Sequence, residues 1–163
     1  MGQYEIDISV RENLWITSIP NIELLTQNTI TAVLKHSAHS DQQLELSIVL
    51  ANNAFIQDLN KQYRNQDKPT NVLSFPQTSE DDTDAQFLPI LNLGDIIIAY
   101  ETIIKESEEQ GKSEVDHYTH MLIHGCLHLL HYDHQNDCEA QTMERIEIEI
   151  LHEMNIKNPY ETH

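Results

Sequence analysis

Six of the ten histidines in this chain lie within 18 residues, at positions 117, 120, 124, 128, 131 and 134. His124 and His128 are four residues apart, so on a helix both rings lie on one face and can reach a single ion. His134 follows ten residues after His124, beyond an expected helix end near His131, where a returning chain can supply a third nitrogen. Three imidazoles leave one tetrahedral position for water, which is the arrangement of a catalytic zinc site. The spacing therefore predicts one Zn²⁺ per chain. Core histidines bonded to carbonyl groups are the alternative, which would suit a lone pair better than three.

The residues next to these histidines indicate which class of enzyme the spacing fits. The same histidine spacing occurs in metzincin proteases, H-E-x-x-H-x-x-G-x-x-H, where the glutamate after the first histidine is the general base. Gly125 stands at that place here, so a peptidase would need a base from elsewhere. His120, one turn earlier on the same face, is interpreted as a hydrogen-bond partner of a ligand. Cys126 lies on the other side of the helix and is interpreted as a core residue.

The elements that must position these histidines combine strands with helices. Alternating or continuous apolar residues predict strands over 4–10, 44–50, 71–75 and 96–99, the last of them central because both of its faces are apolar. Helical periodicity predicts helices over about 20–37, 52–63, 100–110, 113–131 and 138–154. This order predicts an α+β fold, with one domain over residues 1–163, a mixed sheet of about four strands and about five helices. The metal site would lie on a helix of the C-terminal half.

Local signals refine the ends and faces of these elements. Ser113, with Asp116 three residues later, predicts a capping box, and Asp137 is a natural N-cap for the last helix. On that helix the pattern predicts an inward stripe and a solvated acidic face, formed by Met143, Ile146, Ile150 and Met154 and by Glu139, Glu144, Glu149 and Glu153 respectively. The acidic and hydroxyl-rich segment 77–84 is predicted to be a solvated loop.

Charge argues against nonspecific RNA binding. The chain holds 27 acidic and 9 basic residues, a formal net charge of −18, which repels nucleic acid and anionic membranes at long range. Three of the nine basic residues, Lys61, Arg64 and Lys68, nevertheless fall within eight residues and form a local basic spot. The sequence has no apolar window typical of a membrane span and no signal peptide, which predicts a cytoplasmic location without membrane contact.

Three separate motifs resemble the YbeY family. The run from His124 to His134, HGCLHLLHYDH, is similar to the family signature HGxLHLxGYDH. The run NKQYRNQDKPTNVLSFP at 60–76 resembles a second conserved block, and LGDI at 93–96 matches the motif that precedes the central strand of the family. The order and spacing of the motifs agree as well, so the resemblance covers roughly residues 45–160.

The resemblance implies a function and a set of site residues. It implies a single-strand-specific, metal-dependent endoribonuclease that acts in ribosomal RNA maturation, including the 3′ end of 16S rRNA, and in quality control of small ribosomal subunits. The family zinc ligands correspond to His124, His128 and His134, and its activity-associated arginine corresponds to Arg64. A planar guanidinium can hold two phosphate oxygens, and Lys61 and Lys68 are candidates for neighbouring phosphates of the substrate. Docking on a ribosomal particle or a protein partner would bring RNA to so acidic a protein.

Two other functions stay open at this point. A zinc hydrolase of another class, such as a peptidase, would use the same histidine spacing. A ribosome-assembly factor would hold its metal mainly for structure. No general base is evident, because Asp133 adjoins a ligand and is interpreted as orienting it, and the RNA 2′-hydroxyl is a possible nucleophile. His131 replaces the common glycine of the motif, so it must adopt a positive φ or the helix must end differently.

Overall fold

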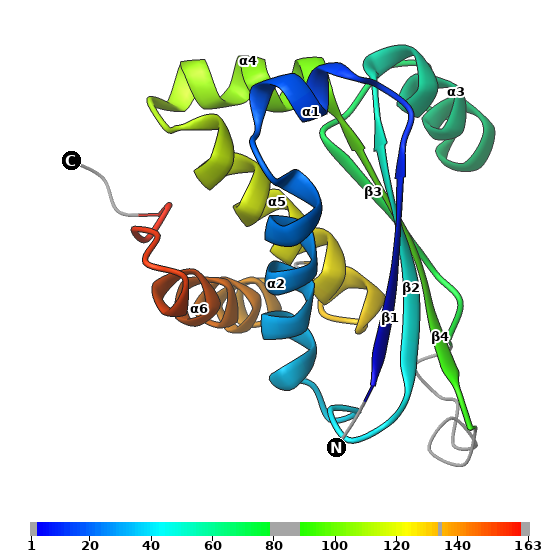
Figure 1. Ribbon diagram of the computed structural model, residues 1–163, viewed down its shortest axis with the longest axis vertical. Helices are drawn as coiled ribbons and strands as arrows, with labels where there is room; N and C mark the ends of the chain where they lie inside the picture. Colours follow the sequence, from blue (N-terminus) through cyan, green and yellow to red (C-terminus); the bar gives the residue numbers. More distant parts are fainter. Residues whose placement is uncertain (1–2, 79–88, 134, 161–163) are drawn as a thin grey trace.

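The computed structural model describes residues 3–78, 89–133 and 135–160 (Figure 1). The sheet has the strand order β1-β2-β4-β3, with β1 (Tyr4–Val10), β2 (Leu44–Ala51), β3 (Val72–Pro76) and β4 (Leu91–Ala99). Strands β1, β2 and β4 are parallel, whereas β3 pairs antiparallel with β4 and forms one edge. The predicted mixed sheet of four strands is therefore confirmed, and β4 is a central strand as expected.

Helices fill most of the remaining described residues: α1 (Leu14–Ser18), α2 (Ile22–Lys35), α3 (Asn53–Arg64), α4 (Tyr100–Gln110), α5 (Glu114–Leu129) and α6 (Asp137–Glu153). The described chain thus has one helix more than the five predicted. The additional helix, α1, is too short for periodicity to detect, and it is held by packing: Trp15 is fully buried and its Nε1–H donates to the Ala51 carbonyl at 2.9 Å. No helix in residues 3–78, 89–133 and 135–160 is long and apolar enough to cross a membrane.

The helices cover the two faces of the sheet unequally. Helix α3 packs on one face, where Ile56 belongs to a small cluster with Leu73 and Ile97. The other helices gather on the opposite face around the main core, which includes Ile96 and Ile98 of β4 (Figure 1). Helix α5 crosses this core in contact with α2, β4 and the edge strand β3. Its C-terminal turns therefore lie beside the sheet edge.

Helix α5 is buried because most of its positions face other elements. Tyr118, Leu122, Cys126 and Leu129 are fully buried in the main core, which confirms the interpretation of Cys126 as a core residue. Burying a continuous apolar surface of this kind is the main driving force of folding. The helix therefore forms a fixed scaffold for the histidines on its remaining positions.

Strand β4 begins at Leu91, five residues before the start predicted from its apolar run. The difference arises at a bulge, where Glu45 pairs with Asn92 but Leu46 pairs with Gly94. Gly94 has φ +127°, a conformation that only glycine adopts without strain, and an added Cβ would lie 2.1 Å from the Phe75 carbonyl oxygen. Gly94 of the LGDI motif thus allows β3 to approach β4 closely.

The cap predictions hold for one helix and fail for the other. Ser113 caps α5, because its side chain accepts a hydrogen bond from the Asp116 N–H at 3.1 Å, which is one of the two bonds of the predicted capping box. The cap of α6 was predicted at Asp137 but is Asn136, whose side chain accepts from the Glu139 N–H at 2.9 Å. Asparagine and aspartate both cap helices. Asn136 is the cap because its side-chain oxygen reaches the N–H of Glu139, which has no partner within the helix. Most of the predicted loop 77–84 lies outside the described residues.

Candidate active site

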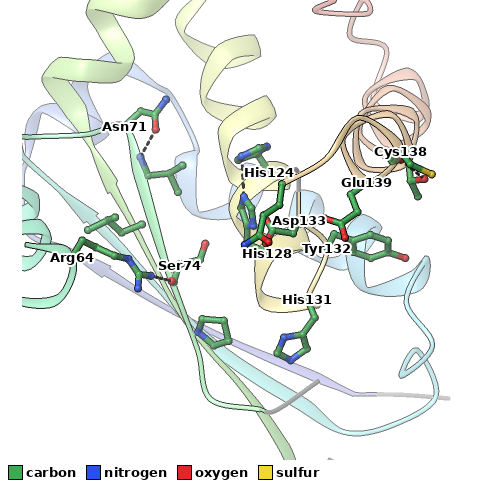
Figure 2. Close-up of a pocket in the computed structure, with 15 residues that line it drawn as sticks. Arg64, Asn71, Ser74, His124, His128, His131, Tyr132, Asp133, Cys138 and Glu139 are labelled. Carbon is green, nitrogen blue, oxygen red and sulfur yellow. Dashed lines mark hydrogen bonds between the residues drawn. The ribbon is translucent and has the colours of Figure 1, made fainter. Parts of the chain in front are cut away.

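A pocket of about 1000 Å³ lies between the free edge of β3 and the adjoining ends of α5 and α6 (Figure 2). The walls come from four elements and the segments beside them, with two of the elements in the first half of the chain and two in the second half. Strand β3 contributes Val72 and Ser74, α5 contributes His124 and His128, and α6 contributes polar side chains from its first two turns. Arg64, the last residue of α3, reaches the pocket from the other side of the edge strand. Residues distant in the chain thus meet at one place.

The two helical histidines point at each other with the same ring atom. His124 Nε2 and His128 Nε2 are 3.1 Å apart, and the ring planes are 83° apart. Two nitrogens bound tetrahedrally to one zinc at about 2.0–2.1 Å would be roughly 3.3 Å apart. The pair therefore fits two positions of a zinc site. The predicted third ligand, His134, lies outside the described residues, and within those residues no three histidine, cysteine or acidic side chains form a metal-binding group.

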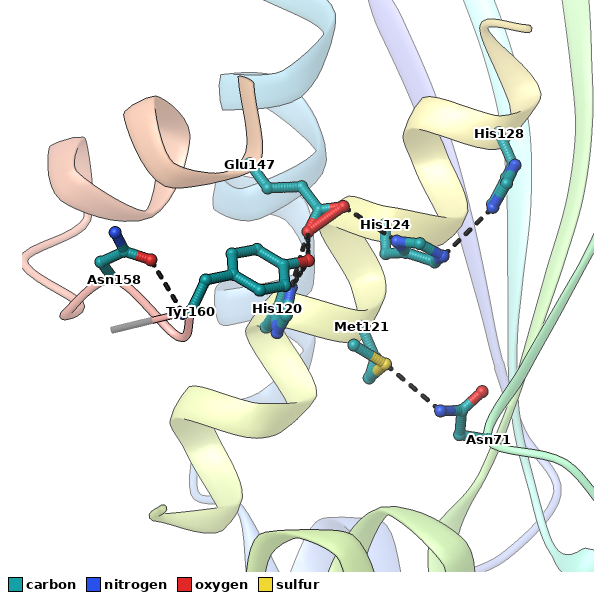
Figure 3. Close-up of polar contacts among 8 residues, drawn as sticks. All are labelled: Asn71, His120, Met121, His124, His128, Glu147, Asn158 and Tyr160. Carbon is teal, nitrogen blue, oxygen red and sulfur yellow. Dashed lines mark hydrogen bonds and ion pairs between the residues drawn. The ribbon is translucent and has the colours of Figure 1, made fainter. Parts of the chain in front are cut away.

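His124 is held from behind by a buried carboxylate. Its Nδ1 lies 2.8 Å from Glu147 Oε2, and the other oxygen of Glu147 accepts from His120 Nε2 at 2.7 Å and from the Tyr160 hydroxyl (Figure 3). Burial by itself would raise the pKa of Glu147, but the hydrogen bonds from His120, His124 and Tyr160 lower it, to about 2. The carboxylate is therefore ionised at neutral pH. The sequence predicts that His120 bonds to a metal ligand, but its Nε2 contacts Glu147, so it is linked to His124 through this carboxylate.

Glu147 is the residue of this site that the sequence analysis missed. The sequence pattern predicts an inward stripe on α6 of Met143, Ile146, Ile150 and Met154 and a solvated face of four glutamates, and it gives no role to Glu147. Glu147 is four residues after Met143 and three before Ile150, so helical geometry places it on the same buried face. Its side chain is 1% exposed. The spacing of Glu147 from Met143 and Ile150 is the sequence feature that could have predicted its burial. Glu139 is exposed, as predicted for the solvated face, and it also lines the pocket.

The C-terminal end of α5 depends on a left-handed residue at His131, where φ is +70°. The N–H groups of Tyr132 and His131 donate to the carbonyls of Leu127 and His128, both at 3.0 Å, which are the two bonds of a Schellman motif. A non-glycine residue in this conformation costs roughly 1–2 kcal/mol. His131 also contacts the Thr78 hydroxyl at 2.8 Å through Nε2. The helix therefore ends with His131 in the left-handed conformation that glycine usually adopts at this position, and the chain then turns back along the pocket wall.

Arg64 is positioned by the edge strand. Its Nη2 donates to the Ser74 carbonyl at 3.0 Å, and its guanidinium carbon lies 5.2 Å from the centre of the Phe75 ring. These contacts bring Arg64 into the pocket with His124 and His128, whereas Lys61 and Lys68 are exposed and are not part of the described pocket lining. The proposed substrate-binding role of the two lysines stays a prediction.

Gly125 lets α5 lie close to the sheet. An added Cβ would be 3.0 Å from methyl groups of both Ile96 and Val72, and the Ser74 hydroxyl donates to the Gly125 carbonyl at 2.8 Å. A glutamate at this position would need space that the two strands occupy. The metzincin general base therefore has no counterpart at position 125, for a steric as well as a chemical reason.

Comparison with known proteins identifies the family. A sequence model described as "Endoribonuclease YbeY" matches residues 8–155, a range that includes the whole described pocket lining. The chain belongs to the YbeY family. Three relatives named Endoribonuclease YbeY illustrate how far the similarity extends. The Rhizobium etli protein is 50% identical over 99% of this chain and 95% of its own length. The Colwellia psychrerythraea protein is 46% identical over 88% of this chain and 90% of its own.

The third relative, from Paramagnetospirillum magneticum, is 42% identical over 96% of this chain and 95% of its own length. A solved structure supports the fold independently. The solution structure of a Thermotoga maritima protein matches with a TM-score of 0.57, covering 92% of this chain and 91% of the other at 23% identity. The YbeY family resemblance drawn from the three motifs is thus confirmed, and the arrangement of the sheet and helices recurs in that protein.

Proposed function

We propose that this chain is a metal-dependent endoribonuclease over its whole length, 1–163, and that it cleaves single-stranded RNA in the pocket beside β3. Its membership of the YbeY family supports the reaction class. The observation that carries the proposal is the meeting of the His124 and His128 Nε2 atoms, 3.1 Å apart, in one pocket with Arg64. A Lewis acid and a fixed cation both stabilise the charge that develops when a phosphodiester is cleaved, and this pocket combines residues suited to supply them.

His124, His128 and His134 would hold one Zn²⁺ per chain. The fit of the first two rests on their Nε2 separation, and the role of His134 rests on its place in the motif. When bound, the metal would polarise a phosphoryl oxygen and lower the pKa of a bound water molecule. The other ring nitrogen of His124, Nδ1, lies 2.8 Å from Glu147, and the turn at His131, with φ +70°, follows three residues after His128.

Arg64 would stabilise negative charge on the phosphate during cleavage. A guanidinium carries five N–H donors in a fixed plane, and the hydrogen bond to the Ser74 carbonyl uses one amino group. The others can hold two phosphate oxygens at once. Lys61 and Lys68, within four residues of Arg64 in the sequence, would contact flanking phosphates of a longer RNA. The nucleophile is the RNA 2′-hydroxyl or a water molecule, and the chemical ends of the products distinguish them.

The substrate would be ribosomal RNA, including the 3′ end of 16S rRNA, within the small ribosomal subunit in the cytoplasm. The net charge of −18 supports a requirement for docking on a ribosomal particle or protein partner, since free RNA is repelled at long range. The same charge is what favours the second candidate, an assembly factor in which metal is mainly structural. Gly125, packed against Ile96 and Val72, weighs against the peptidase.

Cleavage assays with one RNA in two forms test the proposal. Protein stripped of metal and reloaded with Zn²⁺ should cut an unstructured oligonucleotide and leave the same sequence uncut in a duplex. A cyclic phosphate end on the product would identify the 2′-hydroxyl as nucleophile. His128→Ala, which removes one metal-facing nitrogen, is the matched inactive control. Folded, zinc-loaded protein without activity on either RNA, and unfolding on removal of zinc, would favour the assembly factor.

A further inference from the structure

The buried carboxylate of Glu147 is fully engaged from three directions (Figure 3). Oε2 accepts from His124, and Oε1 accepts from both His120 and Tyr160. The side chain is 1% exposed, so water does not compete for these bonds. The donors come from α5 and from the segment after α6, which closes over the carboxylate: the Tyr160 ring packs edge-on against His120 with centroids 5.5 Å apart. The carboxylate cannot rotate without breaking bonds at both oxygens.

This arrangement determines which nitrogen of His124 carries a proton. An ionised carboxylate only accepts hydrogen bonds, so the contact of 2.8 Å places the proton on Nδ1 of His124. In a neutral imidazole the other nitrogen, Nε2, then carries the lone pair. Nε2 is the atom that lies 3.1 Å from His128 Nε2. Glu147 thus sets both the tautomer and the ring orientation of His124.

We propose that Glu147 is a positioning residue of the metal site, which fixes His124 as the Nδ1–H tautomer so that Nε2 faces the ion. The inference rests on the proposed function for the identity of the bound group, but the tautomer is a property of the metal-free chain. Partners of this kind usually contribute 10–100-fold to metal affinity. His120 and Tyr160 support the carboxylate without reaching the pocket lining.

The chain offers a matched control on the same helix. His117 Nε2 lies 2.8 Å from Glu106 Oε1, and the His117 side chain is 2% exposed. This is again a buried histidine with a carboxylate from a neighbouring helix, but His117 is not among the residues of the pocket lining and the contact uses its Nε2. Glu106 also accepts hydrogen bonds from Asn71 Nδ2 at 3.1 and 3.2 Å, and Asn71 is part of the pocket lining. Changes at Glu106 therefore report the cost of losing a buried histidine–carboxylate pair that includes no predicted metal ligand.

An isosteric substitution separates positioning from packing. In Glu147→Gln the amide oxygen should accept the hydrogen bonds from His120 and Tyr160. An amide NH₂ group in that place would be opposed by the donor hydrogens of both residues. The amide NH₂ would then face His124 Nδ1 and favour a proton on Nε2 instead. The volume is unchanged, so a residue that matters only for packing would tolerate this change. A positioning residue would not.

The experiment measures two quantities on each protein. Zinc affinity is obtained by competition with a chromophoric chelator, and the tautomer of His124 is read from long-range ¹H–¹⁵N spectra of the metal-free protein. Wild type should show His124 protonated at Nδ1. Glu147→Gln and Glu147→Ala should weaken zinc binding 10–100-fold, and Glu147→Gln should move the proton to Nε2. Glu106→Gln should leave zinc affinity within about twofold and the His124 signals unchanged. Melting curves confirm that each variant folds.

Wild-type His124 with its proton on Nε2, or Glu147→Gln with unchanged zinc affinity, would overturn the proposal. A loss of affinity equal to that of Glu106→Gln would do the same, because it would show a general effect of weakened packing. If Glu147→Ala does not fold, Glu147→Gln alone decides. Absence of RNA cleavage in a wild-type protein that has the expected tautomer and affinity would refute the proposed reaction and leave the role of Glu147 standing.

Discussion

Arg64 is held beside the pocket by a backbone carbonyl and an aromatic ring, and neither contact neutralises its charge. Because the side chain is exposed and is not placed as a metal ligand, Arg64→Ala should keep the fold and the zinc content. Loss of a fixed donor to transition-state charge should lower the single-turnover cleavage rate by about 100-fold or more. Arg64→Lys should recover only part of the rate, since an ammonium lacks the two-pronged geometry of a guanidinium.

The measurement is single-turnover cleavage of an unstructured RNA at saturating protein, with zinc-loaded samples and melting curves. Lys105→Ala is the control, because Lys105 is an exposed residue of α4 away from the pocket. It should match wild type. A normal rate at saturation combined with weaker RNA binding in Arg64→Ala would limit Arg64 to binding the substrate.

His117 should make the fold sensitive to mild acid. Burial lowers its pKa, although the contact with Glu106 opposes the shift. Between the folded pKa and the unfolded value of about 6.5, the unfolded chain binds more protons, so the free energy of unfolding falls as pH decreases through this window. One such group contributes at most about 1.4 kcal/mol per pH unit. In metal-free protein, urea unfolding at pH 7.5 and 5.5 should show a larger loss for wild type than for His117→Gln. Equal losses would contradict this expectation.

The sequence predicts the positions and roles of some site residues better than those of others. His124 and His128 were predictable because their spacing on one helix determines their proximity. The role of Glu147 depends on how α6 lies against α5, and a glutamate on an acidic helix looks like a solvated residue until that packing is known. For His131 the sequence predicts either a positive φ or a different helix end, because the local sequence does not decide between the two.

Substitution of Gly94 tests whether β3 and β4 approach each other as closely as the structure shows. Any side chain here meets the Phe75 carbonyl at 2.1 Å, in a backbone conformation of φ +127°. Gly94→Ala should therefore lower the free energy of unfolding by at least about 3 kcal/mol, because the backbone of β3 or β4 must move. Gly111→Ala is the matched control: φ is +65°, and no atom lies within 4 Å of the added Cβ. It should cost only about 1–2 kcal/mol.

Denaturant unfolding measures both variants. Equal losses for Gly94→Ala and Gly111→Ala would mean that β3 does not approach β4 as closely as the structure has it. Because Ser74 of β3 holds both Arg64 and α5, we expect Gly94→Ala to reduce cleavage as well, even in the fraction that remains folded.

Elements with regular periodicity could be predicted, and those defined by long-range packing could not. The main helices repeat an apolar pattern with helical spacing, and β1 and β2 place an apolar residue at every second position over at least seven residues. Helix α1 has five residues and depends on burial of Trp15, so no local pattern indicates it. The first half of β4 contains a bulge that interrupts alternation, and only its pairing with β2 and β3 defines it as a strand.

The whole molecule is acidic, and this should appear in the salt dependence of RNA binding. Of the residues that line the described pocket, Arg64 is the only lysine or arginine, and Lys61 and Lys68 bring the local basic spot to three. Each phosphate neutralised on a single strand contributes about −0.7 to the slope of log K against log salt. The slope should therefore lie between 0 and about −2. Titrations of an uncleavable oligonucleotide from 50 to 300 mM salt would measure it, and a slope beyond about −4 would require a further basic surface.

The central claim is that His124, His128 and His134 together hold the one metal ion that RNA cleavage requires. The most direct test follows zinc per chain and single-turnover cleavage in the same samples, as zinc is added back to stripped protein. We predict a rate that rises in proportion to bound zinc and stops rising at about one zinc per chain. His124→Ala, His128→Ala and His134→Ala proteins should each bind zinc weakly and cleave little. Full cleavage by stripped wild-type protein, or one retained zinc in all three variants after mild chelation, would contradict it.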